Sequence, residues 1–247
     1  MLPLAVVRAG LDACGCFPTG RHYAGIAHLL RAVTRGLLEE LAADGGWAEM
    51  PIVMIDTETT GKDASVDRVV EVGIAVARGG AIVHRQNWLV NPGIPIPKEA
   101  SDVHKITDED VKDAPAFAAV AAEVAGLLAG CIPAAYNAAF DKAFLSSEFA
   151  RAGLTLRRDL EWVDPLVWAR ELQQGERSRT LGEVAARLGI AHENAHRAAD
   201  DAETALKVLL ALGRDVRVPR AYGALVQEQR RFALAQADER RLRWRGN

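Results

Sequence analysis

Two acidic residues end an otherwise apolar segment, "IVMIDTETTG" at residues 52–61. Its four apolar residues predict a buried strand, and Asp56 and Glu58 follow that strand directly. Because side chains alternate across a strand, these two carboxylates point to the same face, with Cα atoms roughly 6.5 Å apart. Unpaired, they repel and raise each other's pKa, a conflict that an oxygen-bound cation such as Mg²⁺ removes. The simpler alternative is a strand end whose acids cap a helix or face solvent.

A third acidic residue, Asp141, lies in "YNAAFDKAFL" at residues 136–145. It follows a predicted buried strand and opens a predicted helix. Asn137 and Phe140 beside it supply a hydrogen-bonding amide and a flat apolar face. An acid in the first turn of a helix is often only a partner of the helix dipole, so this segment does not by itself indicate a site.

The segment "HRAADDAETALKVLLAL" at residues 196–212 separates two neighbouring acids by helical geometry. Asp201 shares a stripe with apolar residues and is predicted to face the core, whereas Asp200 shares one with polar residues and is predicted to face water. His196 precedes Asp201 by five residues, which is about 140° of rotation on one helix. The two side chains therefore converge only if His196 lies on the loop before the helix. A lone histidine here also fits a surface or capping role.

The elements that must position these residues alternate in kind along the chain. Apolar runs predict strands at 51–57, 69–77, 81–90 and 131–137, with a short one within 160–165, and Arg78-Gly79-Gly80 predicts a hairpin. Helical patterns are predicted at 115–129, 140–152, 165–173, 180–188 and 198–212. Strands that first form a meander and then mix with helices predict an α/β domain with a mixed sheet.

Composition is that of a globular protein: 247 residues, 49% hydrophobic and 26% charged. The net charge of −3 gives no global basic character, so contact with nucleic acid must be local or carried by metal ions. Three cysteines without metal-site spacing predict a reducing compartment. No apolar run approaches the ~20 residues of a membrane span, and the chain is predicted to be cytoplasmic.

Changes in pattern divide the chain into three parts. Residues 1–50 are predicted to form a helical N-terminal extension with an apolar stripe that packs on the main domain or on a second copy of the chain. Residues 51–213 form the main domain, and residues 214–247 a basic helical tail with nine arginines and four acids. Two interpretations of the tail stay open, packing through its partial apolar stripe and contact with a nucleic-acid backbone.

Taken together, the motifs resemble the DEDDh family of 3′→5′ exonucleases, especially the proofreading epsilon-subunit type of bacterial DNA polymerase III. The matching segments between residues 51 and 212 are "IVMIDTETTG", "DRVVEVGIAV", "EASDVHKITDEDV", "PAFAAVAAEV", "YNAAFDKAFL" and "HRAADDAETAL". Each segment alone is weak, but their combination in this order is specific. The resemblance implies a ribonuclease-H-like fold with a mixed five-stranded sheet flanked by helices.

The resemblance also implies roles for single residues. The four acidic residues are Asp56, Glu58, Asp141 and Asp201, and His196 is the histidine that names the subfamily. The residues implied around the terminal nucleotide are Thr57, Thr59, Val103, His104, Asn137 and Phe140. Phe140 is equally compatible with the core, and His104 with capping the following helix. Tyr136 stands where the family often has a histidine, which leaves fine substrate preference open.

The implied activity is two-metal hydrolysis of phosphodiester bonds from 3′ ends, with two Mg²⁺ or Mn²⁺ ions and release of nucleoside 5′-monophosphates. In this hypothesis Asp56 bridges both ions, Glu58 and Asp201 complete one site, Asp141 helps to hold the other, and His196 is the general base. The expected substrate is a single-stranded or frayed 3′ end, DNA for proofreading or repair. Alternatives are an oligoribonuclease or RNA-trimming enzyme, and a non-catalytic nucleic-acid or polymerase adaptor. A DNA polymerase subunit and a second copy of the chain are further candidate partners.

Overall fold

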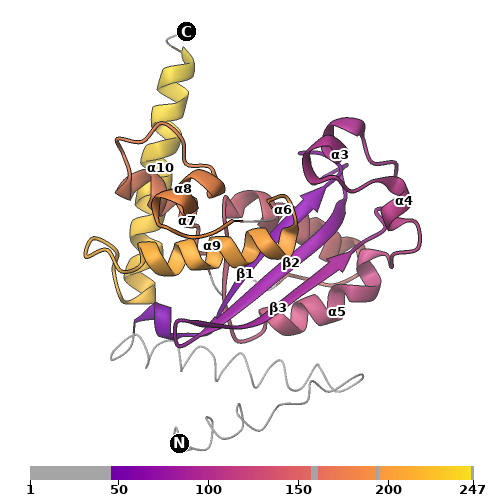
Figure 1. Ribbon diagram of the computed structural model, residues 1–247, viewed down its shortest axis with the longest axis horizontal. Coiled ribbons are helices and arrows are strands. Elements are labelled where there is room, and N and C mark those ends of the chain that lie inside the picture. Colours follow the sequence, from indigo (N-terminus) through magenta and orange to yellow (C-terminus); the bar gives the residue numbers. More distant parts are fainter. Residues whose placement is uncertain (1–45, 157–160, 193–194, 246–247) are drawn as a thin grey trace, which may run out of the picture.

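The computed structural model of the chain (Figure 1) describes residues 46–156, 161–192 and 195–245, with side chains up to residue 242. At its centre lies a sheet of four strands, β1 (Ile52–Thr59), β2 (Val69–Arg78), β3 (Ala81–Leu89) and β4 (Ile132–Ala135). The strand order is β3-β2-β1-β4. β2 pairs antiparallel with both β1 and β3, while β4 pairs parallel with β1. The predicted mixed sheet of an α/β domain is therefore confirmed.

Helices cover both faces of this sheet (Figure 1). The helices of the two layers are α5 (Phe117–Leu128), α6 (Ala138–Arg151), α7 (Pro165–Leu172), α8 (Leu181–Arg187), α9 (Ala198–Leu212) and α10 (Tyr222–Arg245). The other described helices are η1 (Trp47–Glu49), α3 (Lys98–His104) and α4 (Asp108–Val111). α5 and α6 pack on one face, and α9 packs on the other together with α7, α8 and α10. Both faces of β1, β2 and β4 are thus buried, whereas much of β3 is exposed.

Alternation along β1 distributes its side chains between the two layers. Ile52 and Met54 belong to the core cluster under α9, whereas Val53 and Ile55 belong to the cluster under α5 and α6. A strand buried on both faces reads as a continuous apolar run, which is what residues 52–55 show. By the same alternation, Asp56 and Glu58 point to the face that α9 covers, as Ile52 and Met54 do, and Thr57 points toward α6.

The expectation of five strands is wrong by one for the residues that the structure describes. Val163 makes only an isolated parallel bridge to Ala134 beside β4. The chain then leaves the sheet because the Asp164 carboxylate caps α7, accepting a 2.9 Å hydrogen bond from the Leu166 amide. Pro165 at the first position of α7 has no amide hydrogen with which to extend a ladder.

Helix α3 was not among the predicted helices. It is only seven residues long, follows Pro97 and ends at Lys105, which adopts the left-handed conformation with φ 61°. No side chain caps its start and His104 is its only buried residue, so it has no apolar stripe that a sequence pattern could reveal. After it, the Thr107 hydroxyl and amide both donate to the Asp110 carboxylate and so cap the start of α4.

The basic tail forms helix α10, which packs on α7 and on residues 161–164. Phe232 contacts Trp168 edge to face, with ring centroids 5.4 Å apart. Gln229 accepts a 2.8 Å hydrogen bond from the Asp164 amide and donates one of 2.8 Å to the Trp162 carbonyl. The predicted N-terminal extension, up to residue 45, lies outside the described residues.

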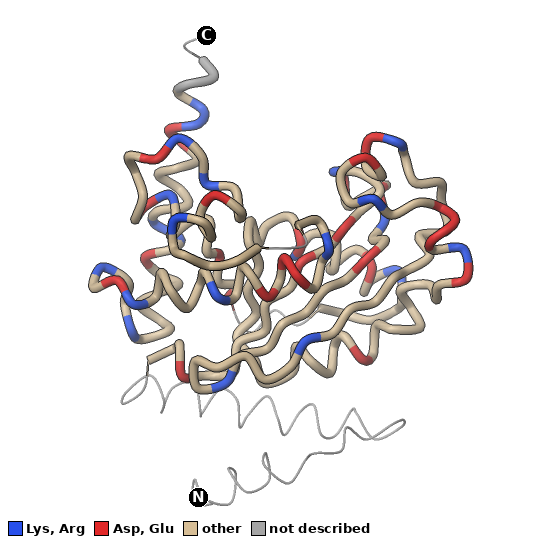
Figure 2. The backbone as a smooth tube through the Cα atoms, viewed as in Figure 1, with Lys and Arg blue, Asp and Glu red and all other residues tan. Residues whose placement is uncertain are grey.

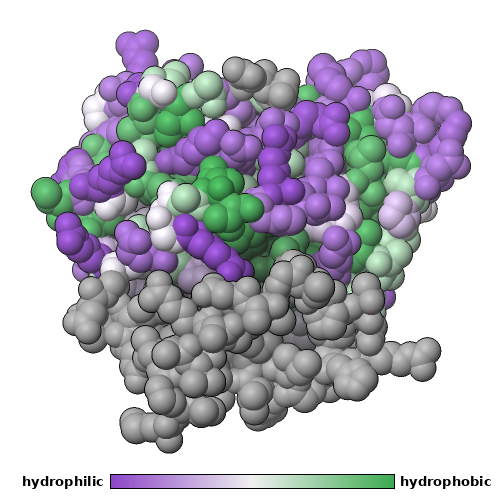
Figure 3. Space-filling view, turned by 60° about the horizontal axis from the view of Figure 1, so that its bottom comes forward, coloured by the Kyte–Doolittle hydropathy of each residue, from purple (hydrophilic) through white to green (hydrophobic). Residues whose placement is uncertain are grey.

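The surface of the described residues is mixed in polarity. Figure 3 shows a mainly hydrophilic face with a hydrophobic area near its centre. Large exposed apolar side chains are spread over separate elements, for example Val83 on β3 and Val103 on α3. Within the described part of the chain, no helix combines the length and the apolar character needed to cross a membrane.

Candidate metal and catalytic site

Three acidic segments converge at one end of the sheet. Because β1 and β4 are parallel, their carboxyl ends lie at the same edge, and α6 begins just after β4. α9 crosses the other face of the sheet from β2 to β1, with its first turn near this edge (Figure 1). Figure 2 shows acidic positions, in red, gathered where α9 meets β1 and β2. The topology therefore brings residues 56–58, 141 and 201 together.

The Asp141 carboxylate is bound from the neighbouring strand. Asp141 is 3% exposed, in the first turn of α6. The Thr57 hydroxyl donates a 2.8 Å hydrogen bond to Asp141 Oδ1. Burial raises the pKa of Asp141 to about 7, although this hydrogen bond acts in the opposite direction. Thr57 thus contacts a carboxylate of the site.

The pKa of Asp56 is raised by burial and by the charges of the neighbouring acids. Loss of hydration on burial raises its pKa well above the ordinary value. The negative charges of Asp141, Glu58 and Asp201 raise that pKa further, in this order. Each of the other three predicted acids is therefore close enough to act on Asp56, so the four form one electrostatic unit.

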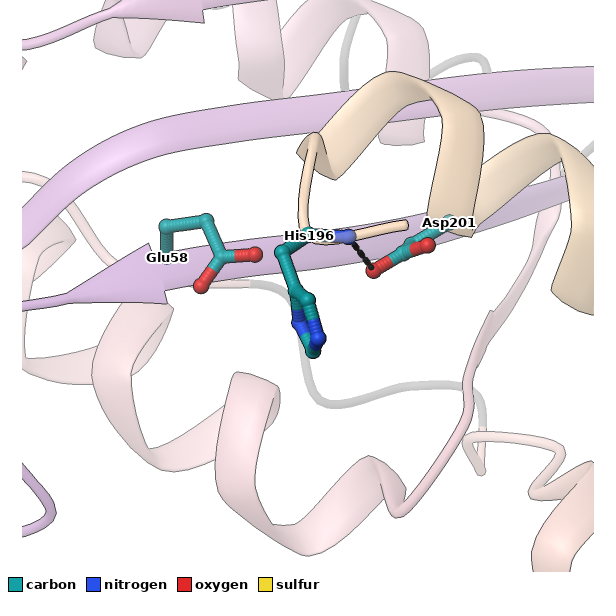
Figure 4. Close-up of side chains that lie close together, drawn as sticks. All are labelled: Glu58, His196 and Asp201. Atoms are coloured by element: carbon teal, nitrogen blue, oxygen red, sulfur yellow. Dashed lines mark hydrogen bonds between the residues drawn. The ribbon is translucent and has the colours of Figure 1, made fainter. Parts of the chain in front are cut away.

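Glu58, His196 and Asp201 form a compact group of ligand atoms (Figure 4). One ligand atom from each of these residues lies within 4.8 Å of those from the other two. Burial and, after it, the negative charge of Asp201 raise the pKa of Glu58 to about 7. The three side chains come from the end of β1, from the turn before α9 and from the first turn of α9.

The turn before α9 takes an unusual backbone conformation at His196. Its φ is 68°, in the left-handed region, and its backbone amide donates a 3.1 Å hydrogen bond to Asp201 Oδ2. His196 therefore lies on the loop and not on the helix, as convergence with Asp201 requires. The imidazole is exposed, which leaves it accessible to a bound molecule.

Helix α9 approaches the sheet so closely because Gly73 has no side chain. A Cβ atom at Gly73 on β2 would lie 1.9 Å from the carbonyl carbon of Ala198, the first residue of α9. Backbone atoms cannot move aside for such a contact without shifting the helix. Gly73 therefore sets how near the first turn of α9, with Asp201, lies to β1 and β2.

Sequence reasoning missed His192, which also contacts the site. Its Nε2 atom forms a close hydrogen-bonding contact with Asp201 Oδ1, and both side chains are mostly buried. The two residues are nine positions apart in the sequence, which on one helix would be about 180° of rotation. The only sequence signal is a second histidine four residues before His196.

The remaining predicted residues have different environments. The Thr59 hydroxyl donates to the Gly61 carbonyl at 2.6 Å and so stabilises the turn after β1. Val103 is 50% exposed, whereas His104 is 2% exposed. His104 Nδ1 accepts a hydrogen bond from the Ile106 amide, its Nε2 has no partner among the described residues, and burial lowers its pKa. Thr59 thus has a structural contact, and Val103 offers an exposed apolar surface.

Asn137 and Phe140 lie at the start of α6. Asn137 is exposed and has φ 73°, and its backbone amide donates a 3.0 Å hydrogen bond to the Asp164 carboxylate. Phe140 is half-buried and contacts Phe144, with ring centroids 4.8 Å apart. Phe140 therefore packs on the core and is still partly accessible, so both readings of this residue stay open.

The donor set fits hard divalent cations. Asp56, Glu58, Asp141 and Asp201 offer carboxylate oxygens, the ligands that Mg²⁺ and Mn²⁺ prefer. Among the described residues, no lysine or arginine forms an ion pair with Asp56, Glu58 or Asp141, and the charge of Arg197, which lowers the pKa of Glu58, only partly relieves their repulsion. Cations bound between them would provide that relief.

Comparison with known proteins gives a family and relatives. Residues 53–209 match the model of the RNase_T family, described as exonuclease. The chain is 32% identical over 190 residues to a DNA polymerase III of PolC type from Thermotoga maritima, a match that covers 75% of this chain and 14% of the polymerase. It is 32% identical over 152 residues to the 3′-5′ exonuclease DinG of Bacillus subtilis, covering 61% of this chain and 16% of DinG. The chain thus spans only a small part of either relative.

Solved structures show the same fold. A structure of exonuclease X in complex with 5′ overhanging duplex DNA superposes with a TM-score of 0.55 at 22% identity, covering 69% of this chain and 96% of that one. The likeness confirms the ribonuclease-H-like architecture expected from the sequence, apart from the number of strands.

Proposed function

The chain belongs to the RNase_T exonuclease family and carries its exonuclease hydrolase domain, and from this premise we propose a metal-dependent 3′→5′ exonuclease. Its reaction is hydrolysis of phosphodiester bonds at 3′ ends of nucleic acid, with release of nucleoside 5′-monophosphates. The single observation that carries this proposal is the convergence of Asp56, Glu58, Asp141 and Asp201 beside His196.

Divalent cations are the cofactors of this proposal. When bound, two such ions activate water for attack and stabilise the leaving 3′-oxygen. Glu58 and Asp201 would hold one ion together, Asp141 would support the other, and Asp56, nearest the centre of the repulsion, would contact both. The raised pKa values of Glu58 and Asp141 mean that protons must leave before cations bind. Cleavage assays with each ion alone decide between Mg²⁺ and Mn²⁺.

His196 is proposed as the general base. A neutral imidazole carries a ring nitrogen that can accept a proton from the attacking water. The left-handed backbone at His196 and the hydrogen bond from its backbone amide to the Asp201 carboxylate direct the ring outward from the loop, beside two proposed metal ligands. The base is thereby held close to the place where the water must be bound.

Residues at the start of α6 and at the end of α3 are proposed to hold the terminal nucleotide. The accessible part of Phe140 offers a face for a base, and Asn137 offers an amide, since single strands are commonly gripped by stacking. Val103 and His104 are proposed to join them from the end of α3, which the electrostatic interaction of His104 with Glu71 and His196 supports. Thr57 contributes through its hydrogen bond to Asp141.

We propose DNA as the substrate, presented as a single-stranded or frayed 3′ end. The matches to a DNA polymerase of PolC type and to an exonuclease solved with duplex DNA support this choice. A polymerase subunit is a proposed partner on the same ground. The cytoplasmic location, a second copy of the chain as partner and the boundaries at residues 50 and 213 stay predictions.

The test uses full-length protein, a 5′-labelled single-stranded DNA and the same strand as RNA, as matched duplex and as duplex with a mispaired 3′ end. We expect stepwise shortening of the DNA strand with Mg²⁺ or Mn²⁺, faster on single-stranded and mispaired ends than on matched duplex, and none in excess chelator. Asp56→Asn should bind DNA yet cleave at least about 10³-fold more slowly. Faster cleavage of RNA would favour the RNA-trimming alternative, and binding without cleavage by the wild type would favour the adaptor.

A further inference from the structure

Glu71 is a buried carboxylate that the proposed mechanism does not use. It lies on β2 and is 0% exposed. Its Oε1 accepts hydrogen bonds from Arg197 Nη2 at 2.6 Å and from Asn87 Nδ2 at 2.9 Å, and its Oε2 accepts one of 2.9 Å from the Ala198 amide. A buried charge is tolerated only when it is paired and hydrogen-bonded in this way. Both oxygens are therefore occupied by protein donors, so Glu71 is unsuited to be a metal ligand.

Two of these donors belong to the segment that carries the proposed base. Arg197 directly follows His196, and Ala198 begins α9, whose first turn contains Asp201. Glu71 thus binds the chain between His196 and Asp201, although Arg197 lies 126 positions after it in the sequence. Gly73, two residues along β2 on the same face, leaves room for the same turn of α9.

The position of Glu71 relative to β1 completes the geometry. In the register of β1 and β2, Glu71 lies opposite Glu58. Residues that face each other in an antiparallel pair point to the same side of the sheet. The point at which Glu71 holds the His196 segment is therefore adjacent to Glu58, which forms the three-residue group with His196 and Asp201.

We propose that Glu71 is a positioning residue: together with Arg197, it holds the turn before α9 so that His196 and Asp201 stay within reach of Glu58. This inference rests on the proposed function and deepens it. The hydrogen bonds of Glu71 fix the backbone on both sides of the junction between loop and helix, at Arg197 and Ala198. Releasing them frees the left-handed turn at His196 to rotate the imidazole away from the site.

Glu148 provides a matched control. It is 1% exposed on α6, and its carboxylate accepts hydrogen bonds from Arg68 Nε at 2.6 Å, Arg68 Nη2 at 3.0 Å and Arg151 Nη1 at 3.1 Å. Both glutamates are thus buried and paired with arginine, but Glu148 has no contact with the His196 segment. A general loss of stability should affect the Glu71→Gln and Glu148→Gln variants alike.

The experiment compares these two variants in the full-length protein. Thermal unfolding, calorimetric Mn²⁺ binding, and kcat and KM on single-stranded DNA are measured for each. We expect both to unfold at lower temperature than the wild type, but only Glu71→Gln to weaken Mn²⁺ binding and to lower kcat, by about 10- to 100-fold, with KM within about threefold. Equal changes in kcat and in Mn²⁺ affinity for the two variants would overturn the proposal.

A double-mutant cycle tests whether Glu71 acts through His196. In a His196→Ala background and at saturating Mn²⁺, Glu71→Gln should lower kcat by less than about threefold, because the imidazole that it positions is already absent and excess cation offsets the weaker hold on Asp201. The same factor in both backgrounds would contradict the proposal. If Glu71→Gln does not fold, Arg197→Gln replaces it, since the Arg197 side chain is 50% exposed and its loss is milder; Arg197→Lys should restore part of the activity.

The failure of the proposed function is distinguishable from that of this inference. A wild type that binds Mn²⁺ but cleaves no nucleic acid would refute the exonuclease activity alone. In that case the comparison of Mn²⁺ affinities still decides the role of Glu71, since the inference requires weaker binding in Glu71→Gln than in Glu148→Gln.

Discussion

Thr57 and Asp141 are joined by a 2.8 Å hydrogen bond from hydroxyl to carboxylate, although 84 positions separate them in the chain. This bond lowers the pKa of Asp141, against the effect of burial, which raises it to about 7. Thr57→Val should therefore raise that pKa further and weaken Mn²⁺ binding at pH 7 by about tenfold, since one pKa unit is worth 1.36 kcal/mol. Calorimetric titration measures the affinity. Thr57→Ser keeps the hydroxyl and should bind as the wild type does; equal affinities in Val and Ser variants would contradict this role.

Glu58 should destabilise the metal-free protein at neutral and alkaline pH. Its pKa rises from 4.5 to about 7 on folding, so the fold favours the protonated form. The stability that this carboxyl contributes is fully present below its unfolded pKa and is lost as the pH rises through 7. In chelator, Glu58→Gln should therefore exceed the wild type in stability by about 1–3 kcal/mol at pH 8, and by little at pH 4.5.

Denaturant unfolding of both proteins at the two pH values measures this difference. With saturating Mn²⁺ the order should reverse, because the wild type gains stability from a cation that the variant binds poorly. A wild type that is the more stable protein in chelator at pH 8 would show that the carboxylates do not repel each other as the geometry indicates.

The two histidines near Asp201 should differ in their effect on rate. His196→Ala removes the proposed base and should lower kcat by about 10²–10⁴-fold while leaving the unfolding temperature nearly unchanged, because the side chain is exposed. His192→Ala removes only a neighbour of Asp201 and should cost less than about tenfold. Single-turnover cleavage of labelled DNA measures both. A larger loss at His192 than at His196 would reassign the base.

Gly73 should tolerate no side chain. A Cβ there would lie 1.9 Å from an Ala198 backbone atom, so Gly73→Ala should force α9 outward and cost about 1–3 kcal/mol or more of folding free energy, with a parallel loss of activity. Gly126 on α5 is the control, because a Cβ there meets nothing within 4 Å. Gly126→Ala should be neutral or stabilising by up to about 1 kcal/mol. Urea unfolding of the two variants decides between them, and similar stabilities would contradict the close packing.

Regular elements with strong local patterns were predictable from the sequence. The alternation and apolar run at residues 52–55 predicted β1, and the 3.6-residue period over 198–212 predicted α9 together with the inward side of Asp201. These inferences succeed because the burial of a side chain in a strand or helix repeats with the geometry of that element alone. Elements without such a repeat were not predicted correctly. Helix α3 was missed, and the strand expected near Val163 is only a single bridge.

The sequence by itself determined which residues could do the chemistry, through the order and spacing of Asp56, Glu58, Asp141, His196 and Asp201. Only the tertiary structure decided what surrounds them. The bond from Thr57 to Asp141, the contact of His192 with Asp201 and the hold of Glu71 on Arg197 all depend on sheet register and helix packing. Such contacts join side chains that share no local period, so they arise when the layers of the fold pack together and leave no signal in the chain itself.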